Sequence, residues 1–293
     1  MEWWQAIVLG LVEGITEYLP VSSTGHLILA SALMKLDTGP ARDALGDYEI
    51  VIQGGAILAV LGLYWPRVVQ MLRGIIGRDP VGLRLVINLL IAFVPAAVLG
   101  LIVHDRVKAH LFHAGPVLGA VLIGGLYMIV VDFWQKGRLS PRPPEPALKG
   151  LDELTPAGAL LIGLLQCVSL WPGTSRSMTT ITGALFAGLR PTAAAEFSFL
   201  LGLPTLGAAT LYSLYEDIRR ARATNAPDLF HALGPVTTLI GLVVAAASAA
   251  LAIKWLVGFL NRRGLTPFGL YRIALFMVLA SLIWAGVVTI APG

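Results

Sequence analysis

Charge is what this sequence has least of. Only 13% of its 293 residues are Asp, Glu, Lys or Arg, about half of the roughly 25% that is typical of soluble domains. In contrast, 56% are hydrophobic and the mean hydropathy is +0.78. This composition excludes an ordinary soluble domain and places the chain among membrane proteins. We therefore expect the net charge of +4 to lie in cytoplasmic loops, and we expect no nucleic-acid partner.

Several other signals are also missing. Cys167 is the single cysteine, so no disulfide can form within the chain. No G-x4-G-K-[ST] pattern occurs, which excludes a Walker-type phosphate-binding loop. No positively charged segment precedes the first apolar run, so we expect no cleaved signal peptide.

Long apolar runs are abundant. Six are long enough to span a membrane, at about 48–65, 84–104, 114–134, 193–214, 232–258 and 267–290. Residues 3–36 and 154–189 differ, because each has a polar centre between two apolar halves of about 10–14 residues. Such halves suit a re-entrant hairpin, whose irregular turn must face protein or water. We expect an all-α integral membrane protein with six transmembrane helices and two re-entrant helix–loop–helix hairpins.

The two polar-centred regions resemble each other. Residues 10–13 (GLVE) align with residues 163–166 (GLLQ). The hydroxyl residues then match in order, Thr16 with Ser169, Ser22 with Ser175, and Thr24 with Ser177. Paired broken segments in two halves of a membrane protein point to a site at the middle of the bilayer.

Three spans follow each hairpin, so the second half would be inserted upside down. We expect one membrane domain built from inverted-repeat halves at approximately 1–134 and 154–290, joined by a Pro-rich linker at 135–153. Of the 21 Lys and Arg residues, 12 fall on the linker's side and 7 on the other. The positive-inside rule then makes the linker cytoplasmic, and the first hairpin opens outward.

The first hairpin carries the stretch EGITEYLPVSSTGH at 13–26. Glu13 and Glu17 are four residues apart and share one face of a short helix. Two adjacent carboxylates suit a divalent cation, and hard oxygen ligands favour Mg²⁺ or Ca²⁺. The alternative is a pair of carboxylates that face solvent at a helix end.

A helix break at Pro20 separates these acids from a group of small polar residues: Ser22, Ser23, Thr24 and Gly25. Hydroxyls at a helix start are ordinary N-caps, but the same geometry binds anions through free backbone N–H groups. His26 lies in the first turn of the following helix, close enough to Ser23 or Thr24 to act as a base or acid.

The second hairpin carries WPGTSRS at 171–177. The planar fork of Arg176 suits phosphate oxygens, and Thr174, Ser175 and Ser177 could cap the next helix and donate N–H groups to the same anion. The alternative is that Arg176 pairs with Glu13 or Glu17.

Two functional classes fit these features. A secondary transporter uses inverted halves and broken helices, and here it would move a prenyl phosphate lipid carrier. The combination of acids, hydroxyls, a histidine and an arginine favours hydrolysis of a phosphate ester or diphosphate on a lipid, because a carrier needs no nucleophile and base.

The two quoted motifs resemble the signature motifs of the undecaprenyl-diphosphate phosphatase family, also called the bacitracin-resistance protein family. The resemblance covers nearly the whole chain, including AAEFSFLLGLP at 194–204 and LYRIAL at 270–275. It implies a multi-pass enzyme of the bacterial inner membrane, with interdigitated inverted repeats, an outward-facing site and a divalent-metal requirement. Such an enzyme hydrolyses undecaprenyl diphosphate to undecaprenyl phosphate and inorganic phosphate, which recycles the lipid carrier of peptidoglycan synthesis and confers bacitracin resistance. The implied partners are a prenyl diphosphate substrate and membrane lipids; a homodimer is left open.

The resemblance also assigns roles to residues. The implied catalytic residues are Glu13, Glu17, Ser23, Thr24, His26 and Arg176. We expect the substrate to be bound by Ser22, Gly25, Thr174, Ser175, Arg176 and Ser177, of which the resemblance implies Ser22, Ser175 and Arg176. We expect the metal ligands to be Glu13 and Glu17. In the mechanism we expect, Ser23 (or else Thr24 or Ser22) attacks the terminal phosphorus or orients a water, and His26 handles the proton. Met178 departs from the glycine usual in the family at this position.

Overall fold

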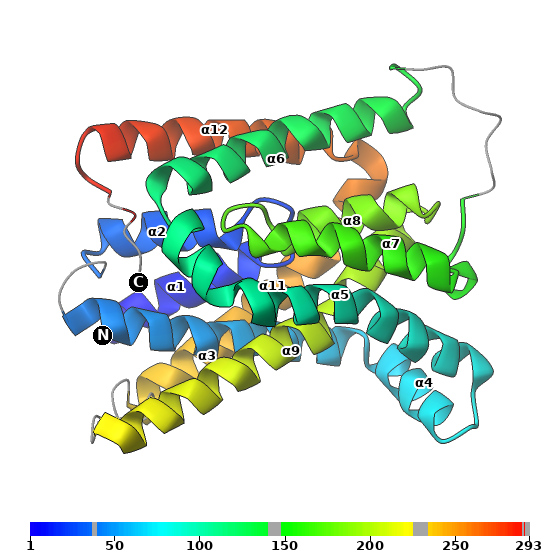
Figure 1. Ribbon diagram of the computed structural model, residues 1–293, viewed down its shortest axis with the longest axis horizontal. Helices are drawn as coiled ribbons and strands as arrows, with labels where there is room; N and C mark the ends of the chain where they lie inside the picture. Colours follow the sequence, from blue (N-terminus) through cyan, green and yellow to red (C-terminus); the bar gives the residue numbers. More distant parts are fainter. Residues whose placement is uncertain (37–39, 140–147, 225–233, 289, 291–293) are drawn as a thin grey trace.

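The computed structural model describes residues 1–36, 40–139, 148–224, 234–288 and 290, and its regular structure is helical. Five helices are long and apolar enough to cross a membrane, and they run roughly along the longest axis of the molecule (Figure 1). These are α5 (Pro80–Leu111), α6 (Ala114–Gln135), α9 (Pro191–Thr224), α11 (Pro235–Arg263) and α12 (Thr266–Trp284). The predicted spans between 84 and 290 all fall on these helices, although α12 ends six residues earlier than predicted.

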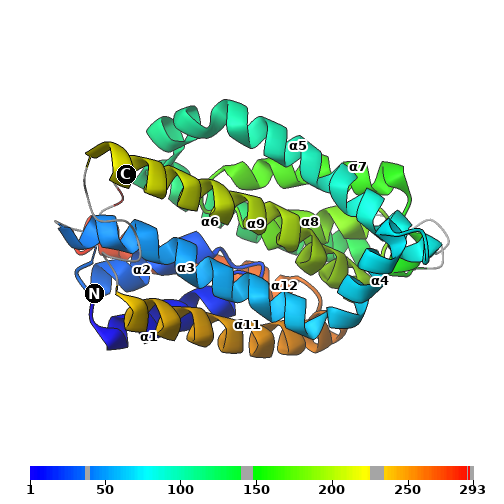
Figure 2. The same cartoon turned by 90° about the horizontal axis from the view of Figure 1, so that it is seen from below.

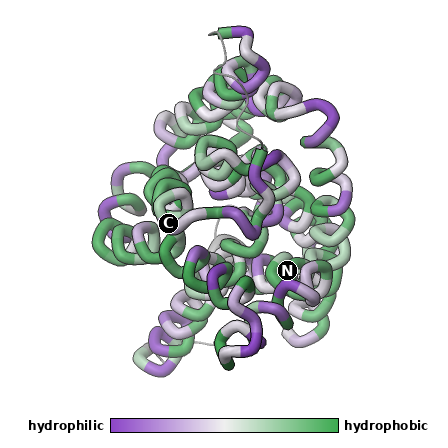
Figure 3. Tube along the Cα trace, turned by 90° about the vertical axis from the view of Figure 1, so that its right-hand side faces the viewer, coloured by the Kyte–Doolittle hydropathy of each residue, from purple (hydrophilic) through white to green (hydrophobic). Residues whose placement is uncertain are grey.

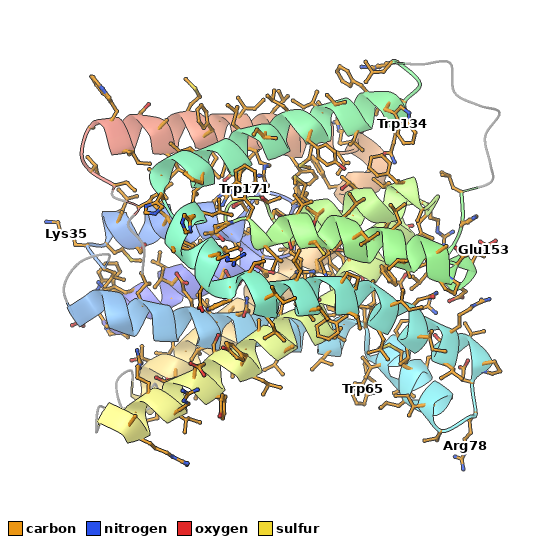
Figure 4. The ribbon with its side chains drawn as sticks, viewed as in Figure 1. Lys35, Trp65, Arg78, Trp134, Glu153 and Trp171 are labelled. Carbon is orange, nitrogen blue, oxygen red and sulfur yellow. The ribbon has the colours of Figure 1, made fainter. Side chains whose placement is uncertain are left out.

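A sixth candidate span is bent. The sequence predicted a span at 48–65. The structure has α3 (Pro40–Leu63) followed at once by α4 (Trp65–Ile75). Residues Val51–Leu63 of α3 and the whole of α4 are together long and apolar enough to cross a membrane. The two helices meet at an angle of 80°. Pro66 lies in the first turn of α4, where proline starts a helix well but cannot continue one. In Figure 4, Trp65 and Arg78 mark this segment at one end of the molecule.

Two helical hairpins lie between the long helices. The first consists of α1 (Trp3–Thr16) and α2 (Ser23–Leu33), and the second of α7 (Pro156–Gln166), η2 (Cys167–Leu170) and α8 (Arg176–Phe186). A short helix, η1 (Leu151–Glu153), precedes the second hairpin. The hairpins enter from opposite ends of the molecule, and their turns lie near its middle (Figures 1 and 2). Figure 4 labels Lys35 after the first hairpin, Glu153 before the second, and Trp171 in the turn of the second.

Small residues let the hairpins approach the long helices closely. Helix α1 packs along α11, and α7 packs along α5. A Cβ on Gly14 would overlap the Ser248 hydroxyl of α11, and a Cβ on Gly163 would collide with the backbone of Ala92 in α5. Close packing at glycine is a general device of helices in membranes, where no hydrophobic effect drives them together.

The exposed and buried surfaces have opposite character. The helical trace is largely hydrophobic (Figure 3), and apolar side chains such as Leu101 and Leu251 are each 71% exposed on the long helices. Glu13, Glu17 and Arg272 are buried instead. Charged side chains buried among apolar helices are costly and are typical of functional sites, so the interior between the hairpins is where a site is expected.

Candidate active site

Both hairpin turns end in a serine with the same unusual backbone. Ser22 has φ +75° and ψ 93°, and its side chain accepts a hydrogen bond from Gly25 N at 3.3 Å. Ser175 has φ +78° and ψ 115°, and its side chain accepts one from Met178 N at 3.3 Å. Among the described residues other than glycine, only these two and Lys35 have positive φ. Such conformations cost about 1–3 kcal/mol and cluster at functional sites.

Glu17 joins the two hairpins. Its Oε1 lies 3.1 Å from Nη2 of Arg176, and its Oε2 accepts a hydrogen bond from the Ser23 hydroxyl at 2.8 Å. Both charged side chains are 8% exposed. The pairing that the sequence left open as an alternative role for Arg176 is therefore present. Glu17 therefore contacts both the hydroxyl of Ser23 and the guanidinium of Arg176.

Arg176 is incompletely satisfied despite this pair. Nη1 donates to the Ser198 carbonyl at 3.0 Å, and the guanidinium lies over the Tyr18 ring, 5.4 Å from its centroid. Its Nε is buried and has no hydrogen-bond partner among the described residues. A buried guanidinium N–H without an acceptor is a donor available to a ligand oxygen.

Glu13 is the least compensated group of the site. Its side chain is 3% exposed, and its Oε2 has no hydrogen-bond partner in the described part of the chain. The charges of Glu17 and Glu49 are close enough to repel it, and Arg176 is the one attracting charge that acts on it. Negative charge therefore exceeds positive charge on this side of the site. The described residues hold no group of three or more His, Cys, Asp or Glu side chains arranged to bind a metal.

His26 does not contact the hydroxyl of Ser23 that it was expected to serve. Its Nδ1 lies 2.7 Å from the Ser22 carbonyl, and its Nε2 lies 2.7 Å from the Tyr271 hydroxyl. A carbonyl only accepts, so Nδ1 carries the proton, and a neutral ring then accepts at Nε2 from Tyr271. The proton of the Ser23 hydroxyl points to Glu17 instead.

The remaining predicted residues divide between the two turns. The Ser177 hydroxyl donates to the Leu19 carbonyl at 2.8 Å, and this bond connects the second turn to the first. The Ser175 and Ser177 hydroxyl oxygens lie 3.0 Å apart. Thr174 is buried and uses its backbone in the turn. Gly25 is buried in the capped turn of α2, whereas Thr24 is half-buried. Met178 is buried in the main core.

Two residues of α12 reach the hairpins, although no site residue was predicted there. Tyr271 contacts His26, and Arg272, which is fully buried, donates to the carbonyls of Gly173 and Thr174. The sequence did contain a signal, because an arginine inside a predicted span is a candidate functional residue by default. Its partners lie about a hundred residues away, and no local pattern reveals them.

Comparison with known proteins gives consistent matches along the chain. The family described as Bacitracin resistance protein BacA matches residues 6–278. The chain is similar to "Undecaprenyl-diphosphatase" of Sorangium cellulosum, at 48% identity over 94% of this chain and 84% of that protein. It is also similar to "Undecaprenyl-diphosphatase 2" of Rhodospirillum rubrum, at 45% identity over 97% and 96%, and to "Undecaprenyl-diphosphatase" of Methylococcus capsulatus, at 42% identity over 98% and 97%.

Proposed function

The chain belongs to the Bacitracin resistance protein BacA family, and we propose that it hydrolyses undecaprenyl diphosphate to undecaprenyl phosphate and inorganic phosphate. The reaction recycles the lipid carrier used in peptidoglycan synthesis and thereby confers resistance to bacitracin. The observation that carries the proposal is the convergence of Glu17, Ser23 and Arg176 from two hairpins. The relatives are named as diphosphatases, which favours hydrolysis over transport of a prenyl phosphate.

The first step is transfer of the terminal phosphoryl group to Ser23. Its hydroxyl donates to Glu17, so the carboxylate can take the proton as the Ser23 oxygen attacks phosphorus. The Ser23–phosphorus bond forms while the bond from phosphorus to the bridging oxygen breaks, and undecaprenyl phosphate leaves. Arg176 and the first N–H groups of α2 and α8 stabilise the charge on the transferring group.

The second step is hydrolysis of the phosphoserine. Water attacks phosphorus, the bond to the Ser23 oxygen breaks, Glu17 returns its proton to that oxygen, and inorganic phosphate is released with the oxygen and the two hydrogens of the water. His26 is fixed at both ring nitrogens and serves proton transfer on this side of the site. Direct attack by a water held at Ser23 is the competing route, and Thr24 and Ser22 are the substitute hydroxyls. The ligand groups for phosphate are Ser22, Gly25, Thr174, Ser175, Arg176 and Ser177.

The acids of the first hairpin fit a divalent cation. Glu13 has a buried carboxylate oxygen without a partner, and carboxylate oxygens are what Mg²⁺ and Ca²⁺ prefer. Glu13 and Glu17 would hold the ion, with the other ligands supplied by phosphate or water, as is usual for Mg²⁺. When bound, the cation would neutralise charge on the diphosphate.

We place the protein in the bacterial inner membrane as six spans and two re-entrant hairpins, with inverted-repeat halves at 1–134 and 154–290. Two features support this arrangement: the hairpins enter from opposite ends, and the packing of α1 on α11 has its counterpart in α7 on α5. The excess of Lys and Arg at the end that carries Arg78 makes that end cytoplasmic. The mouth of the first hairpin then opens to the periplasmic side.

The deciding experiment measures phosphate release from undecaprenyl diphosphate by purified protein in detergent, with Mg²⁺, with Ca²⁺ and with EDTA. We expect Ser23→Ala and Glu17→Gln each to lose about 10²–10⁴-fold in kcat. Ser31→Ala is a matched control, because Ser31 is buried on the same helix and bonds only to the Ile28 carbonyl. Normal turnover in both site variants would overturn the site. Lipid-carrier movement in vesicles that survives the loss of hydrolysis would support the transporter instead.

A further inference from the structure

Two consecutive residues of α12, Tyr271 and Arg272, contact one hairpin each. Successive residues on a helix point about 100° apart, so one helix can address two neighbours that lie on different sides of it. Tyr271 reaches the first hairpin at His26, and Arg272 reaches the second at Gly173 and Thr174. Neither side chain contacts the Glu17–Arg176 pair, which separates them from the groups assigned to the phosphate.

Arg272 is a buried cation that is held by carbonyl groups. None of its surface is exposed. Its Nη1 donates to the Thr174 carbonyl at 3.0 Å, and Nη2 donates to the carbonyls of Gly173 and Ala120, each at 2.9 Å. Its Nε donates to the Val121 carbonyl at 3.2 Å. It takes part in none of the ion pairs among the described residues, although a buried charge is costly unless it is compensated.

These bonds fix the backbone just before α8. A peptide unit is planar and trans, so its C=O and N–H point in opposite directions. When Arg272 draws the carbonyls of Gly173 and Thr174 toward itself, the N–H groups of Thr174 and Ser175 must point away from it. The Thr174 N–H closes the turn onto the Trp171 carbonyl at 3.1 Å, whereas the Ser175 N–H has no partner in the described part of the chain.

The Ser175 N–H is thus the first of a series of free donors. Ser175 has φ +78°, and α8 begins at the next residue. The N–H groups of Arg176 and Ser177 also lack intrahelical partners, because the first turn of a helix never supplies them. A left-handed residue followed by a helix start makes successive N–H groups converge on an anion. Gly173 allows the turn, since it has φ +93° and a Cβ there would press on the Val117 carbonyl.

Tyr271 holds a side chain of the first hairpin, the imidazole of His26. Its hydroxyl lies 2.7 Å from His26 Nε2, and the two rings are stacked with centroids 5.5 Å apart. The other ring nitrogen is held by the carbonyl of Ser22, the cap residue of α2. The position and the tautomer of the imidazole are therefore both set by its neighbours.

We infer that Tyr271 and Arg272 are a pair of positioning residues for the hydrolysis: Arg272 presents the free N–H groups of the second hairpin to phosphate, and Tyr271 holds the ring of His26 in place through its Nε2 atom. The inference rests on the proposed function. It predicts different kinetic defects for the two residues, because one prepares phosphate binding and the other prepares proton transfer.

The role of Arg272 is tested with Arg272→Lys. This change keeps the positive charge, but a single ammonium group cannot donate to all four carbonyls that the guanidinium bonds. We expect KM for undecaprenyl diphosphate and the inhibition constant of inorganic phosphate each to rise by at least about tenfold. Arg67→Lys is the matched control, since Arg67 also bonds several groups, Glu196 and Asp152 among them, and none of these belongs to either turn. It should lower thermal stability and leave KM unchanged. Values within about twofold of wild type for folded Arg272→Lys would overturn the role of Arg272.

The test of Tyr271 is Tyr271→Phe, which keeps the ring and removes one hydroxyl from a half-exposed residue, so folding is preserved. We expect kcat to fall about tenfold, the size of effect seen when a residue that orients a working histidine is lost. KM should stay within about twofold, and the pH profile of kcat should change shape. Tyr48→Phe is the control, because the Tyr48 hydroxyl donates to the Ala6 carbonyl outside the site. An unchanged kcat and pH profile for Tyr271→Phe would overturn its role.

Two outcomes separate this inference from the proposed function. If the wild type releases phosphate and both α12 variants behave like it, the positioning roles fail and the phosphatase stands. If the wild type releases no phosphate, the proposed function fails, and binding of pyrophosphate measured by calorimetry still tests Arg272. Equal pyrophosphate affinity in wild type and Arg272→Lys would then contradict its role, whereas a loss of about tenfold would support it.

Discussion

The two hairpins share a backbone device but differ in charge. Each turn ends in a serine at positive φ that caps the helix after it. The residue after that serine is Ser23 in the first hairpin and Arg176 in the second. The nucleophile candidate and the fixed cation therefore occupy corresponding positions and meet at Glu17. Two copies of one turn can therefore build a single phosphate site when one copy carries the nucleophile and the other carries the cation.

The same division appears ten residues earlier in each hairpin. Glu13 of the first hairpin corresponds to Gln166 of the second, and both side chains are buried. Gln166 donates to the Ala92 carbonyl at 3.4 Å and accepts from the Thr205 hydroxyl at 3.4 Å. Glu13 has an oxygen with no partner among the described residues. The neutral amide is satisfied by its two neighbours, whereas the carboxylate is left with an unpaired oxygen, which is the difference on which the proposed cation site rests.

The largest expected effect comes from removing the cation that the second hairpin contributes. Arg176→Gln removes the positive charge that would stabilise the transferring phosphoryl group, and we expect kcat/KM for undecaprenyl diphosphate to fall about 10³–10⁵-fold, as for arginines that stabilise such transition states. Phosphate release by purified protein measures it. Arg219→Gln is the control, because Arg219 lies in an exposed pair with Glu216. A fall below about tenfold would mean that Arg176 serves only to neutralise Glu17.

An intermediate effect comes from exchanging the acid and the amide between the hairpins. Glu13→Gln removes an unpaired buried charge, so thermal stability in detergent should rise, by about 1–3 kcal/mol. The Mg²⁺ concentration that gives half-maximal activity should be higher for Glu13→Gln than for the wild type. Gln166→Glu buries a new carboxylate beside a carbonyl, and we expect it to destabilise the fold by about 3 kcal/mol or more. Thermal unfolding of both variants is the measurement, and shifts of the same sign would refute the distinction between the two positions.

Local patterns were sufficient for some of these features. Apolar runs predicted α5 and α6 because hydropathy and length are properties of a continuous segment. The matching of Ser22 with Ser175 predicted two similar turns, and the structure gives both serines the same backbone conformation. The predicted span at 48–65 ends where α3 meets α4, and the helix α4 itself was not predicted.

Contacts between distant segments were the part that the sequence did not reveal. The bond from Ser23 to Glu17 replaced the expected one to His26, because the first turn folds the hydroxyl toward the acid rather than along its own helix. The partner of His26 turned out to be Tyr271, 245 residues away. Helix order alone does not say which face of α12 meets which hairpin, so these pairs depend on the packing of the whole molecule.

The smallest expected effect tests whether the two serine caps are equivalent. Ser22→Ala and Ser175→Ala each lose a cap, worth about 1 kcal/mol, and keep the cost of about 1–2 kcal/mol that any residue with a Cβ has at positive φ. Ser22→Gly and Ser175→Gly lose the cap but adopt that backbone freely. In both hairpins, glycine should therefore be more stable than alanine by about 1–2 kcal/mol in thermal unfolding. At Thr155, a cap residue with φ −86°, the advantage of glycine should be clearly smaller. If glycine is more stable than alanine at only one of the two serine positions, then the shared backbone conformation is strained in only one of the two hairpins.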